Sequence, residues 1–417
     1  MKVLYLNPDR GIPVLGDKGA SVHVREFTTA AAKLGHEVLL ACATLGNGNP
    51  PPPARIACIE YNVSDVELQA ACSGLGLPES ALSDLALRRE ITRLAYDRTL
   101  SARVLAHLAN TGFRPDVVYE RHALLHRAGI RIATRLGVPR LLEVNAPLVE
   151  EQRRFRGLRL ENESRVAEEE SYRGADAIVA VSVAVAEHVG RVLGSDRTVH
   201  VLANGVDLVR FGKHDGGDAL REQLGIGTAP VLGFVGSFKP WHGMMFLLEV
   251  FRAVVEIRPE VRLIAVGDGP ELEAIRTRVT AWGLDHHVIL PGRVPHDEIP
   301  AWIDAMDVSV APYLPHPDFY FSPLKIIESM AAGRPVVAPR IGQIAELIQD
   351  QGTGRLYAPG DQVACALALL DLIDAPDQRH LMGRAAELDA ANHSWSHVVE
   401  QALSLARGPS LSRAVAQ

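Results

Sequence analysis

The stretch VLGFVGSFKPWHG, residues 231–243, decides how the fold is interpreted, because an apolar run ends there in a glycine turn and a helical pattern follows. The run Val231–Val235 is typical of a buried parallel strand. Short apolar runs of this kind alternate with helical patterns from end to end of the chain. This alternation predicts parallel sheets covered by helices, which is the α/β fold class.

The alternation occurs in two series. In the first half, a helix is expected over 21–34, and strands are expected at 3–7, 37–43, 117–119, 141–144, 177–181 and 199–202. In the second half, strands are expected at 231–235, 261–266, 288–290, 308–311 and 336–338. A chain of 417 residues that is 47% hydrophobic is long enough for two domains.

Two doubly wound domains are therefore expected, with boundaries at 1–208 and 209–389. The segment 211–229 is the best candidate for a linker, because it is rich in glycine and aspartate. A helix over 390–407 follows the second sheet, and residues 408–417 are expected to be a frayed tail.

Composition narrows the class of partner. The net charge is -7 and no dense Lys/Arg stretch occurs, so a nucleic-acid partner is not expected and a small molecule is. Four cysteines without CxxC spacing suit a reducing cytoplasm. No apolar segment is long enough to span a bilayer, which leaves peripheral association with the inner face of a membrane open.

The stretch SPLKIIE, which begins at Ser322, is interpreted as a helix start that binds an anion and a sugar diol. Ser322 suits the N-cap and Pro323 the first helical position, so the N–H groups of Leu324 and Lys325 would point outward. A cation at Lys325 opposes the helix dipole, which favours a negative ligand opposite it. Glu328, one turn on, could accept both hydroxyls of a cis-diol, and phosphate plus ribose describes a nucleotide. The alternative is a solvated Lys/Glu pair on a helix surface.

The turn after residue 235 has the composition of a phosphate cradle. Gly236 and Gly243 let the backbone approach a ligand, while Lys239 and His242 offer positive or donor groups. The alternative is an ordinary loop with a surface lysine. At the same predicted edge, backbone groups around Arg293 and Val294 could hold a flat base.

The first half offers weaker candidates. Gly19 precedes a helix expected to begin at Ser21, where a phosphate or sugar could approach free N–H groups. His122 follows a short strand and would lie at the sheet edge. Asn145 and Glu150 could bind a hydroxylated acceptor, but equally could be loop and helix-start residues.

Together these segments resemble the retaining glycosyltransferases of the GT-B fold, specifically glycosyltransferase family 4, over nearly the whole chain. The most specific parts of the resemblance are GSFKPWHG at 236–243, GDGP at 267–270, the stretch 322–335 that ends ESMAAGRP, and NGVD at 204–207 with Phe211. The resemblance implies two Rossmann-like domains facing a central cleft. It also implies a nucleotide-sugar donor bound mainly by the second domain, an acceptor bound mainly by the first, a final helix returning to the first domain, no cofactor and no obligatory metal.

Three positions match family residues directly. Glu328 matches the carboxylate that binds ribose, Gly19 matches the glycine loop that faces the diphosphate, and His122 matches a histidine near the donor sugar.

Two features of the second half depart from the family pattern. Many members carry Arg and Lys around the loop where this chain has Ser237 and His242. Many also carry a Glu eight residues before the one that matches Glu328, where this chain has Tyr320. Lys239 and Lys325 are expected to restore the positive charge. The donor-binding set implied by the resemblance and the turn chemistry is Gly19, Gly236, Ser237, His242, Arg293, Val294, Tyr320, Ser322, Pro323, Leu324 and Glu328.

The resulting hypothesis is transfer of a sugar from a nucleoside diphosphate to an acceptor hydroxyl with retained anomeric configuration. Since no carboxylate nucleophile is evident, a same-face route is favoured, in which Lys239 and Lys325 stabilise the leaving diphosphate and His122 positions the donor sugar. The acceptor class, a glycan, a glycolipid or a secondary metabolite, stays open. Two rival readings also stay open, a UDP-sugar 2-epimerase-like enzyme and a non-catalytic nucleotide-sugar-binding protein.

Overall fold

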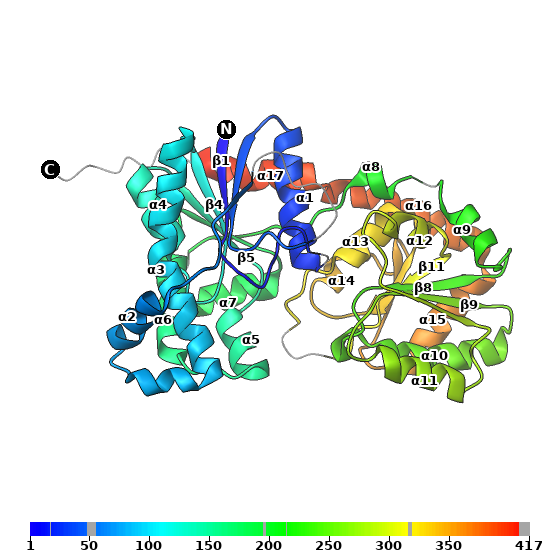
Figure 1. The fold of residues 1–417 in the computed structure, drawn as a ribbon. Coiled ribbons are helices and arrows are strands. Elements are labelled where there is room, and N and C mark those ends of the chain that lie inside the picture. Colours follow the sequence, from blue (N-terminus) through cyan, green and yellow to red (C-terminus); the bar gives the residue numbers. More distant parts are fainter. Residues whose placement is uncertain (17, 48–55, 195–196, 214, 316–318, 408–417) are drawn as a thin grey trace. The chain divides into compact units, whose positions relative to one another are not determined.

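The structure is a computed structural model that describes residues 1–16, 18–47, 56–194, 197–213, 215–315 and 319–407 (Figure 1). The chain forms two compact units. The first contains residues 1–203 together with the segment from Trp395 onward, and the second contains residues 204–394. The expected boundary near residue 208 therefore lies at 203/204, and the expected tail at 408–417 lies outside the described residues.

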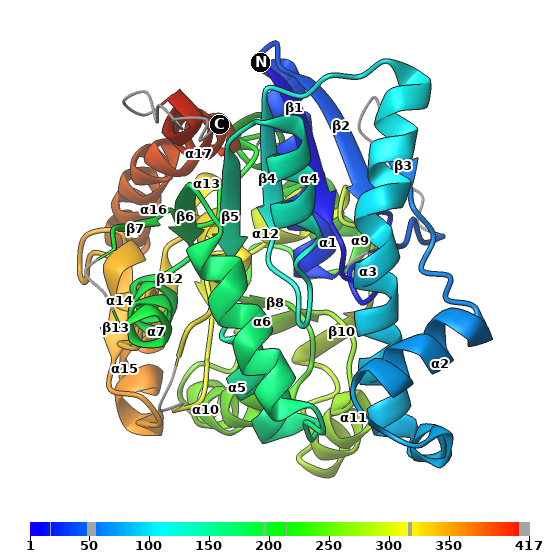
Figure 2. The same ribbon diagram turned by 90° about the vertical axis from the view of Figure 1, so that its left-hand side faces the viewer.

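The first unit is built on a seven-stranded parallel sheet in the order β3-β2-β1-β4-β5-β6-β7. Figure 2 shows β1, β4 and β5 side by side. Its strands are β1 (Lys2–Asn7), β2 (Glu37–Cys42), β3 (Ile56–Cys58), β4 (Val117–Arg121), β5 (Arg140–Val144), β6 (Ala177–Ala180) and β7 (Val199–Val201). Its helices are α1 (Gly19–Lys33), α2 (Asp65–Gly74), α3 (Leu85–Thr111), α4 (Ala128–Leu136), α5 (Leu148–Phe155), α6 (Glu161–Arg173), α7 (Val183–Leu193) and α17 (Trp395–Ser404).

Alternation along the strands divides the core of the first unit between two faces. Leu4 and Leu6 of β1 pack in one cluster with Leu100 and Val104 of α3. On the intervening positions, Tyr119 stacks on Phe27 of α1 with ring centroids 4.4 Å apart, and Tyr5 packs against Phe27 in a tilted arrangement at 5.5 Å. Helices therefore cover both faces of the sheet, as the α/β reading expects.

The second unit has a six-stranded parallel sheet in the order β10-β9-β8-β11-β12-β13. Its strands are β8 (Val231–Val235), β9 (Arg262–Val266), β10 (Val288–Gly292), β11 (Val308–Val310), β12 (Val336–Pro339) and β13 (Gly354–Tyr357). Its helices are α8 (Leu208–Phe211), α9 (Gly217–Gln223), α10 (Met244–Ile257), α11 (Leu272–Ala281), α12 (Ile299–Asp304), α13 (Leu324–Ala331), α14 (Ile344–Leu347), α15 (Gln362–Asp374) and α16 (Pro376–Ala390).

Both sheets have the doubly wound order in which the first strand lies in the middle and the chain reverses direction beside it. In the second unit, β8 lies between β9 and β11. In sheets of this kind, ligands bind outside the carboxyl ends of the strands at this reversal. The residues that follow β1, β4, β8 and β11 are therefore the first candidates for a site.

The segment 211–229 is not a linker. It contains α9 and the end of α8, and Phe211 is buried in the core of the second unit together with Ile226. The glycine and aspartate content that suggested a linker belongs to short helices and their caps, such as Asp207, whose side chain accepts from Val209 N and Arg210 N.

The last helix, α17, belongs to the first unit and lies beside α1 (Figure 1). Trp395 is buried, and its ring meets that of His23 edge-on at 5.0 Å. The expected helix over 390–407 is divided, since Ala390 ends α16 in the second unit. Of the helices in the described part of the chain, none is long and apolar enough to cross a membrane.

Candidate functional site

At the carboxyl edge of the second sheet, the turns that follow β8 and β9 are each hydrogen-bonded to the end of the next strand, β9 and β10. Gly236 N donates to Val266 O over 3.0 Å, and Gly267 N donates to Gly292 O over 2.9 Å. Gly236 has φ +148°, a conformation that side chains rarely adopt, and a Cβ there would lie 2.5 Å from Lys325 Nζ. Glycine at this position therefore lets the lysine approach the turn.

Lys325 is the most informative residue of the site. Its Nζ is buried and has no hydrogen-bond partner among the residues that the structure describes. The ammonium lies 4.3 Å from the ring centroid of Phe234 and 5.0 Å from that of Tyr313. Burial lowers the pKa of Lys325 to about 7, against the opposing effect of Glu328. A buried cation of this kind is costly without an anion, so the geometry favours an anionic ligand here.

His242 lies next to Lys325 but is not a second cation. Its Nδ1 lies 2.6 Å from the carbonyl oxygen of Ser237, so Nδ1 carries the hydrogen and Nε2 is left as an acceptor. Burial and the charge of Lys325 lower the pKa of His242 to about 3. The ring is therefore neutral at pH 7, and the assignment of His242 to donor binding stays a prediction. Tyr313 contacts it edge-on at 5.2 Å and so connects it to Lys325.

The start of α13 differs from the expected capping. The helix begins at Leu324, and Pro323 occupies the N-cap position without a side-chain hydrogen bond. Ser322 instead holds another segment, because its Oγ accepts from Asn204 N at 3.0 Å and its carbonyl accepts from Asn204 Nδ2 at 2.7 Å. The backbone N–H of Asn204 therefore binds the Ser322 Oγ that was expected to cap the helix. Lys325 still lies in the first turn, where helix N–H groups lack acceptors.

Glu328 is buried one turn further along α13 and already has a partner. Its Oε1 lies 3.2 Å from Nε2 of His296, and Nδ1 of that ring lies 3.3 Å from Nη1 of Arg210. Because arginine only donates, Nδ1 must accept, and Nε2 carries the hydrogen that is donated to Glu328. Arg210 and His296 therefore hold the carboxylate in place.

The other expected residues of the second unit differ in exposure and in their neighbours. Lys239 is exposed, with its ammonium 5.0 Å from the Trp241 ring centroid. Arg293 is exposed and Val294 is half-buried against the core. Tyr320 is buried, with its ring 4.5 Å from that of Phe321.

His122 is buried in the first unit. Its Nε2 lies 4.0 Å from Oε1 of Glu168, and its ring lies 5.2 Å from that of Tyr172. Burial lowers the pKa of His122 to about 4, against the effect of Glu168. The ring is thus neutral and enclosed by helix α6, and its assignment to the donor sugar stays a prediction.

Asn145 belongs to a buried network around Glu143 at the end of β5. Its Oδ1 accepts from Arg121 at 2.7 Å, and its Nδ2 donates to Glu143. Glu143 also accepts from Tyr119 at 2.6 Å and from Arg121 at 2.9 Å, and it lies 2.9 Å from His23 Nε2. The amide of Asn145 is therefore oriented by protein groups, which limits what it can offer an acceptor.

The two remaining candidates lie near the surface. Glu150 forms ion pairs with Arg153 at 2.6 Å and Arg165 at 3.1 Å. Gly19 is exposed as the first residue of α1, two residues before the expected start at Ser21. Within the described ranges, no three His, Cys, Asp or Glu side chains are grouped so that they could hold a metal ion.

Sequence reasoning missed the supporting residues of both units. Asn204, Arg210 and His296 act on Ser322 and Glu328 from distant positions, and Glu143 lies in an expected strand without having been predicted as a site residue. The sequence does carry a signal for Glu143, because a carboxylate within the buried run LLEV must be paired. For Asn204, Arg210 and His296, the sequence alone does not show which residues they contact.

The comparisons with known proteins agree with this architecture. A family model described as Glycosyltransferase Family 4 matches residues 18–210, and a model described as Glycosyl transferases group 1 matches residues 229–375. A D-inositol 3-phosphate glycosyltransferase of Thermomonospora curvata is 27% identical, over 95% of this chain and 92% of the relative. A 2-deoxystreptamine N-acetyl-D-glucosaminyltransferase of Streptomyces fradiae is 28% identical, over 79% of this chain and 83% of the relative.

Solved structures show the same fold. Anabaena HepE in complex with UDP is matched with a TM-score of 0.70 at 20% identity, over 97% of this chain and 99% of that one. Sucrose-phosphate synthase from Thermosynechococcus elongatus is matched with a TM-score of 0.72 at 19% identity, over 98% of each chain.

Two Rossmann-like units with this strand order define the GT-B class of glycosyltransferases. The matched segments place the chain further: it belongs to the family 4 type of glycosyltransferase.

Proposed function

We propose that the protein transfers a sugar from a nucleoside-diphosphate-sugar donor to an acceptor hydroxyl with retention of the anomeric configuration. The observation that carries the donor assignment is the buried Nζ of Lys325, without a hydrogen-bond partner among the described residues and 2.5 Å from where a Cβ of Gly236 would lie. A diphosphate supplies the missing anion. Anabaena HepE, solved with UDP and with UDP-glucose, supports a nucleotide of this kind.

The residues around Lys325 suggest how departure of the diphosphate is assisted. Lys325 and the first N–H groups of α13 stabilise the charge that develops on the leaving group, and Lys239 adds a more exposed cation. The diphosphate takes the acceptor proton on the same face of the sugar, so no protein nucleophile is needed. Glu328, fixed by His296, accepts the ribose hydroxyls. His122 positions the donor sugar, and no metal ion is required.

The turnover of a lysine variant tests the donor assignment. Lys325→Ala should lower kcat about 100- to 1,000-fold, the range for loss of one preorganised charge contact. Lys213→Ala, which removes an exposed lysine of the same unit, should leave kcat unchanged. Acceptor-dependent nucleotide release is the assay, with the product anomer assigned by NMR. A kcat of Lys325→Ala within a few-fold of the parent's kcat would contradict the proposal.

The same assay separates the rival activities and the metal question. Release of nucleotide that needs an acceptor identifies transfer, whereas an epimerised donor without acceptor indicates a UDP-sugar 2-epimerase-like enzyme. Full activity after dialysis against EDTA is expected, and activity restored only by a divalent cation would contradict metal independence. The names of the relatives, which include D-inositol 3-phosphate glycosyltransferases, make phosphorylated polyols sensible first acceptors.

A further inference from the structure

Two cysteines of the first unit lie side by side on neighbouring strands. Cys42 ends β2 and Cys58 ends β3, and the two are register partners in this parallel pair. Register partners of this kind project from the same face of a sheet, with their backbones about 4.8 Å apart. That spacing lies within the range of about 4.4 to 6.8 Å between the Cα atoms of disulfide-bonded cysteines. Both cysteines are free thiols in the structure.

The two thiols interact, and they differ in their access to solvent. Cys42 is 1% exposed, whereas Cys58 is exposed on β3, the edge strand of the sheet (Figure 2). Burial raises the pKa of Cys42 to about 12, and the charge and hydrogen bonding of the Cys58 thiol add to this shift. A small oxidant can reach Cys58, while Cys42 is enclosed beside it. The pair therefore offers one thiol that attacks and a second that resolves the product.

The remaining cysteines are engaged by groups other than sulfur. Cys72 is buried, with its Sγ 3.6 Å from Leu77 O and 3.5 Å from Pro78 O. Cys365 is buried in the second unit, where its thiol hydrogen-bonds with the side chain of Tyr357. Neither is expected to react with a small oxidant, because a buried structural thiol is inert.

We propose that Cys58 and Cys42 form a reversible disulfide by exchange with a low-molecular-weight disulfide such as glutathione disulfide. The Cys58 thiol loses its proton to solvent, and the thiolate attacks one sulfur of the small disulfide, whose S–S bond breaks. One small thiolate leaves and takes up a proton. Cys42 then loses its proton and attacks the Cys58 sulfur, which releases the second small thiol. The two protein thiols lose two electrons, and the small disulfide is reduced to two thiols.

The surroundings of Cys42 set the rate of the second step. Cys58 in a mixed disulfide is no longer a thiolate, so its charge no longer opposes ionisation of Cys42. Burial still keeps most of the Cys42 thiol protonated at neutral pH, and only the thiolate attacks. The mixed disulfide on Cys58 should therefore accumulate first. Its conversion should accelerate up to about tenfold per pH unit, as the fraction of Cys42 thiolate rises.

The disulfide fastens the edge of the first sheet. Among the described strands, β3 pairs with β2 alone, through residues 56–58. Residues 43–57 separate the two cysteines along the chain. A cross-link over a loop of this length lowers the unfolding equilibrium constant about 100-fold, because it restricts the unfolded chain. The stability of the first unit thereby follows the thiol–disulfide balance around it, independently of sugar transfer.

Intact-protein mass spectrometry of the full chain during incubation with glutathione disulfide tests the pair. The parent should gain one glutathionyl group and then lose it, ending two hydrogen atoms lighter than the reduced protein, and dithiothreitol should reverse the change. Cys58→Ser should stay unmodified. Cys42→Ser should keep the glutathionyl group, because no thiol resolves it. Cys72→Ser is the matched control and should behave as the parent does.

A parent protein that stays unmodified, or that keeps its glutathionyl group, overturns the proposal. An internal disulfide that also forms in Cys58→Ser overturns it as well. Because Cys58 is exposed, this variant tests the pair even where Cys42→Ser does not fold. Thermal unfolding checks the consequence: the first-unit transition should move to a higher temperature in the oxidised parent and stay in place in oxidant-treated Cys58→Ser. Equal temperatures for the reduced and oxidised parent would contradict the fastening of β3.

Discussion

At the residue scale, Lys325 combines three properties that normally exclude one another in a stable protein. It is cationic below about pH 7, its Nζ is buried, and no described residue accepts a hydrogen bond from it. Aromatic faces of Phe234 and Tyr313 compensate part of the lost hydration. A bound diphosphate would offset the remaining free energy of desolvation of the ammonium. Nucleotide binding should therefore depend on the protonation of Lys325, and so on pH.

Nucleotide affinity should fall as pH rises above 7. The pKa of Lys325 is about 7 in the free protein, and a bound anion raises it, so binding takes up a proton above pH 7. Affinity is then highest below pH 7 and falls roughly tenfold per pH unit above it. Calorimetry at pH 6.5 and pH 8.5 measures this slope. Comparison with Lys325→Met removes the contribution of the nucleotide's own phosphate, and identical slopes for both proteins would contradict the assignment.

Gly236→Ala should abolish tight nucleotide binding. The added Cβ would lie 2.5 Å from Lys325 Nζ and would require φ +148° of a residue with a side chain. Gly283→Ala is the control, because Gly283 also has positive φ but a Cβ there meets nothing within 4 Å. Both variants should lose some stability in thermal unfolding, and only Gly236→Ala should lose UDP affinity. An alanine at 236 that binds UDP normally would show that Lys325 lies elsewhere in the working enzyme.

The sequence was most predictive where the position of a site residue depends on its spacing along one helix. SPLKIIE correctly placed Lys325 in a first helical turn and Glu328 one turn later, because that spacing is fixed by the helix. The predicted capping by Ser322 was wrong, because its hydroxyl accepts a hydrogen bond from the backbone of Asn204, 118 residues away. The partner of Glu328, His296, is likewise distant in sequence, and hydrogen bonds of that kind are decided by the fold.

At the scale of elements, Glu143 joins helix α1 to strands β4 and β5. It receives hydrogen bonds from Tyr119 and Arg121, and His23 approaches it from α1. Burial alone would raise the pKa of Glu143, but His23, Arg121 and Asn145 outweigh it and lower the pKa to about 2. The carboxylate is therefore ionised throughout the physiological range and acts as a structural anchor.

Glu143→Gln should destabilise the protein most near neutral pH. The depressed pKa of Glu143 means that its stabilisation is present above about pH 4.5 and is lost as pH falls toward 2. Breaking a buried charge network costs about 3 to 5 kcal/mol. Urea unfolding at pH 6 and pH 3.5 should show a difference between parent and variant that narrows at the lower pH. Glu187→Gln, at an exposed position of α7, should have the same free energy of unfolding as the parent at both pH values. A difference between the parent and Glu143→Gln that grows at the lower pH would contradict the prediction.

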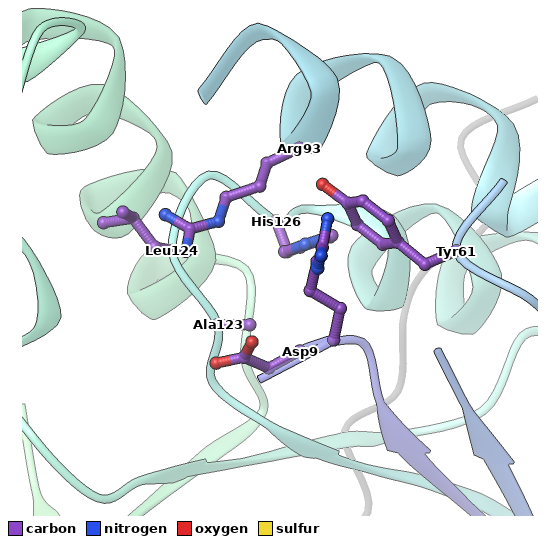
Figure 3. Close-up of a pocket in the computed structure, with 7 residues that line it drawn as sticks. Asp9, Tyr61, Arg93, Ala123, Leu124 and His126 are labelled. Atoms are coloured by element: carbon purple, nitrogen blue, oxygen red, sulfur yellow. The ribbon is translucent and has the colours of Figure 1, made fainter. Parts of the chain in front are cut away.

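Strands were predictable where the apolar run was as long as a buried strand of the sheet. The first and second strands of each sheet were found within one residue, because buried parallel strands are continuously apolar. Strand β3 was missed, since only Ile56–Cys58 pairs with β2. The small pocket of the first unit that is drawn in Figure 3 could not be predicted, because residues of four separate segments line it and only the tertiary fold brings them together.

At the scale of the whole molecule, the chain builds the first unit, then the second, and returns to the first with α17. Trp395 is the buried residue on which this return depends, through its contact with His23. Trp395→Ala should cost about 3 to 5 kcal/mol of unfolding free energy. In calorimetric unfolding, the transition of the first unit should move to a lower temperature. The rise in unfolding temperature that UDP produces in the second unit should be unchanged.

Phe155→Ala is the control for that experiment, because Phe155 lies 54% exposed in the same unit. Its removal should leave the transition of the first unit within the small range of surface substitutions. Equal effects of the two substitutions would mean that α17 contributes little to the first unit.

The most direct test of the donor site is a calorimetric titration with UDP, GDP, ADP and dTDP at pH 6.5. It compares the parent protein with Lys325→Met and with Lys213→Met, the exposed lysine of the same unit. One nucleotide should bind the parent and Lys213→Met equally, and should bind Lys325→Met at least tenfold more weakly. A nucleotide that binds all three proteins alike, or no binding by the parent, would contradict the assignment of Lys325 to the diphosphate.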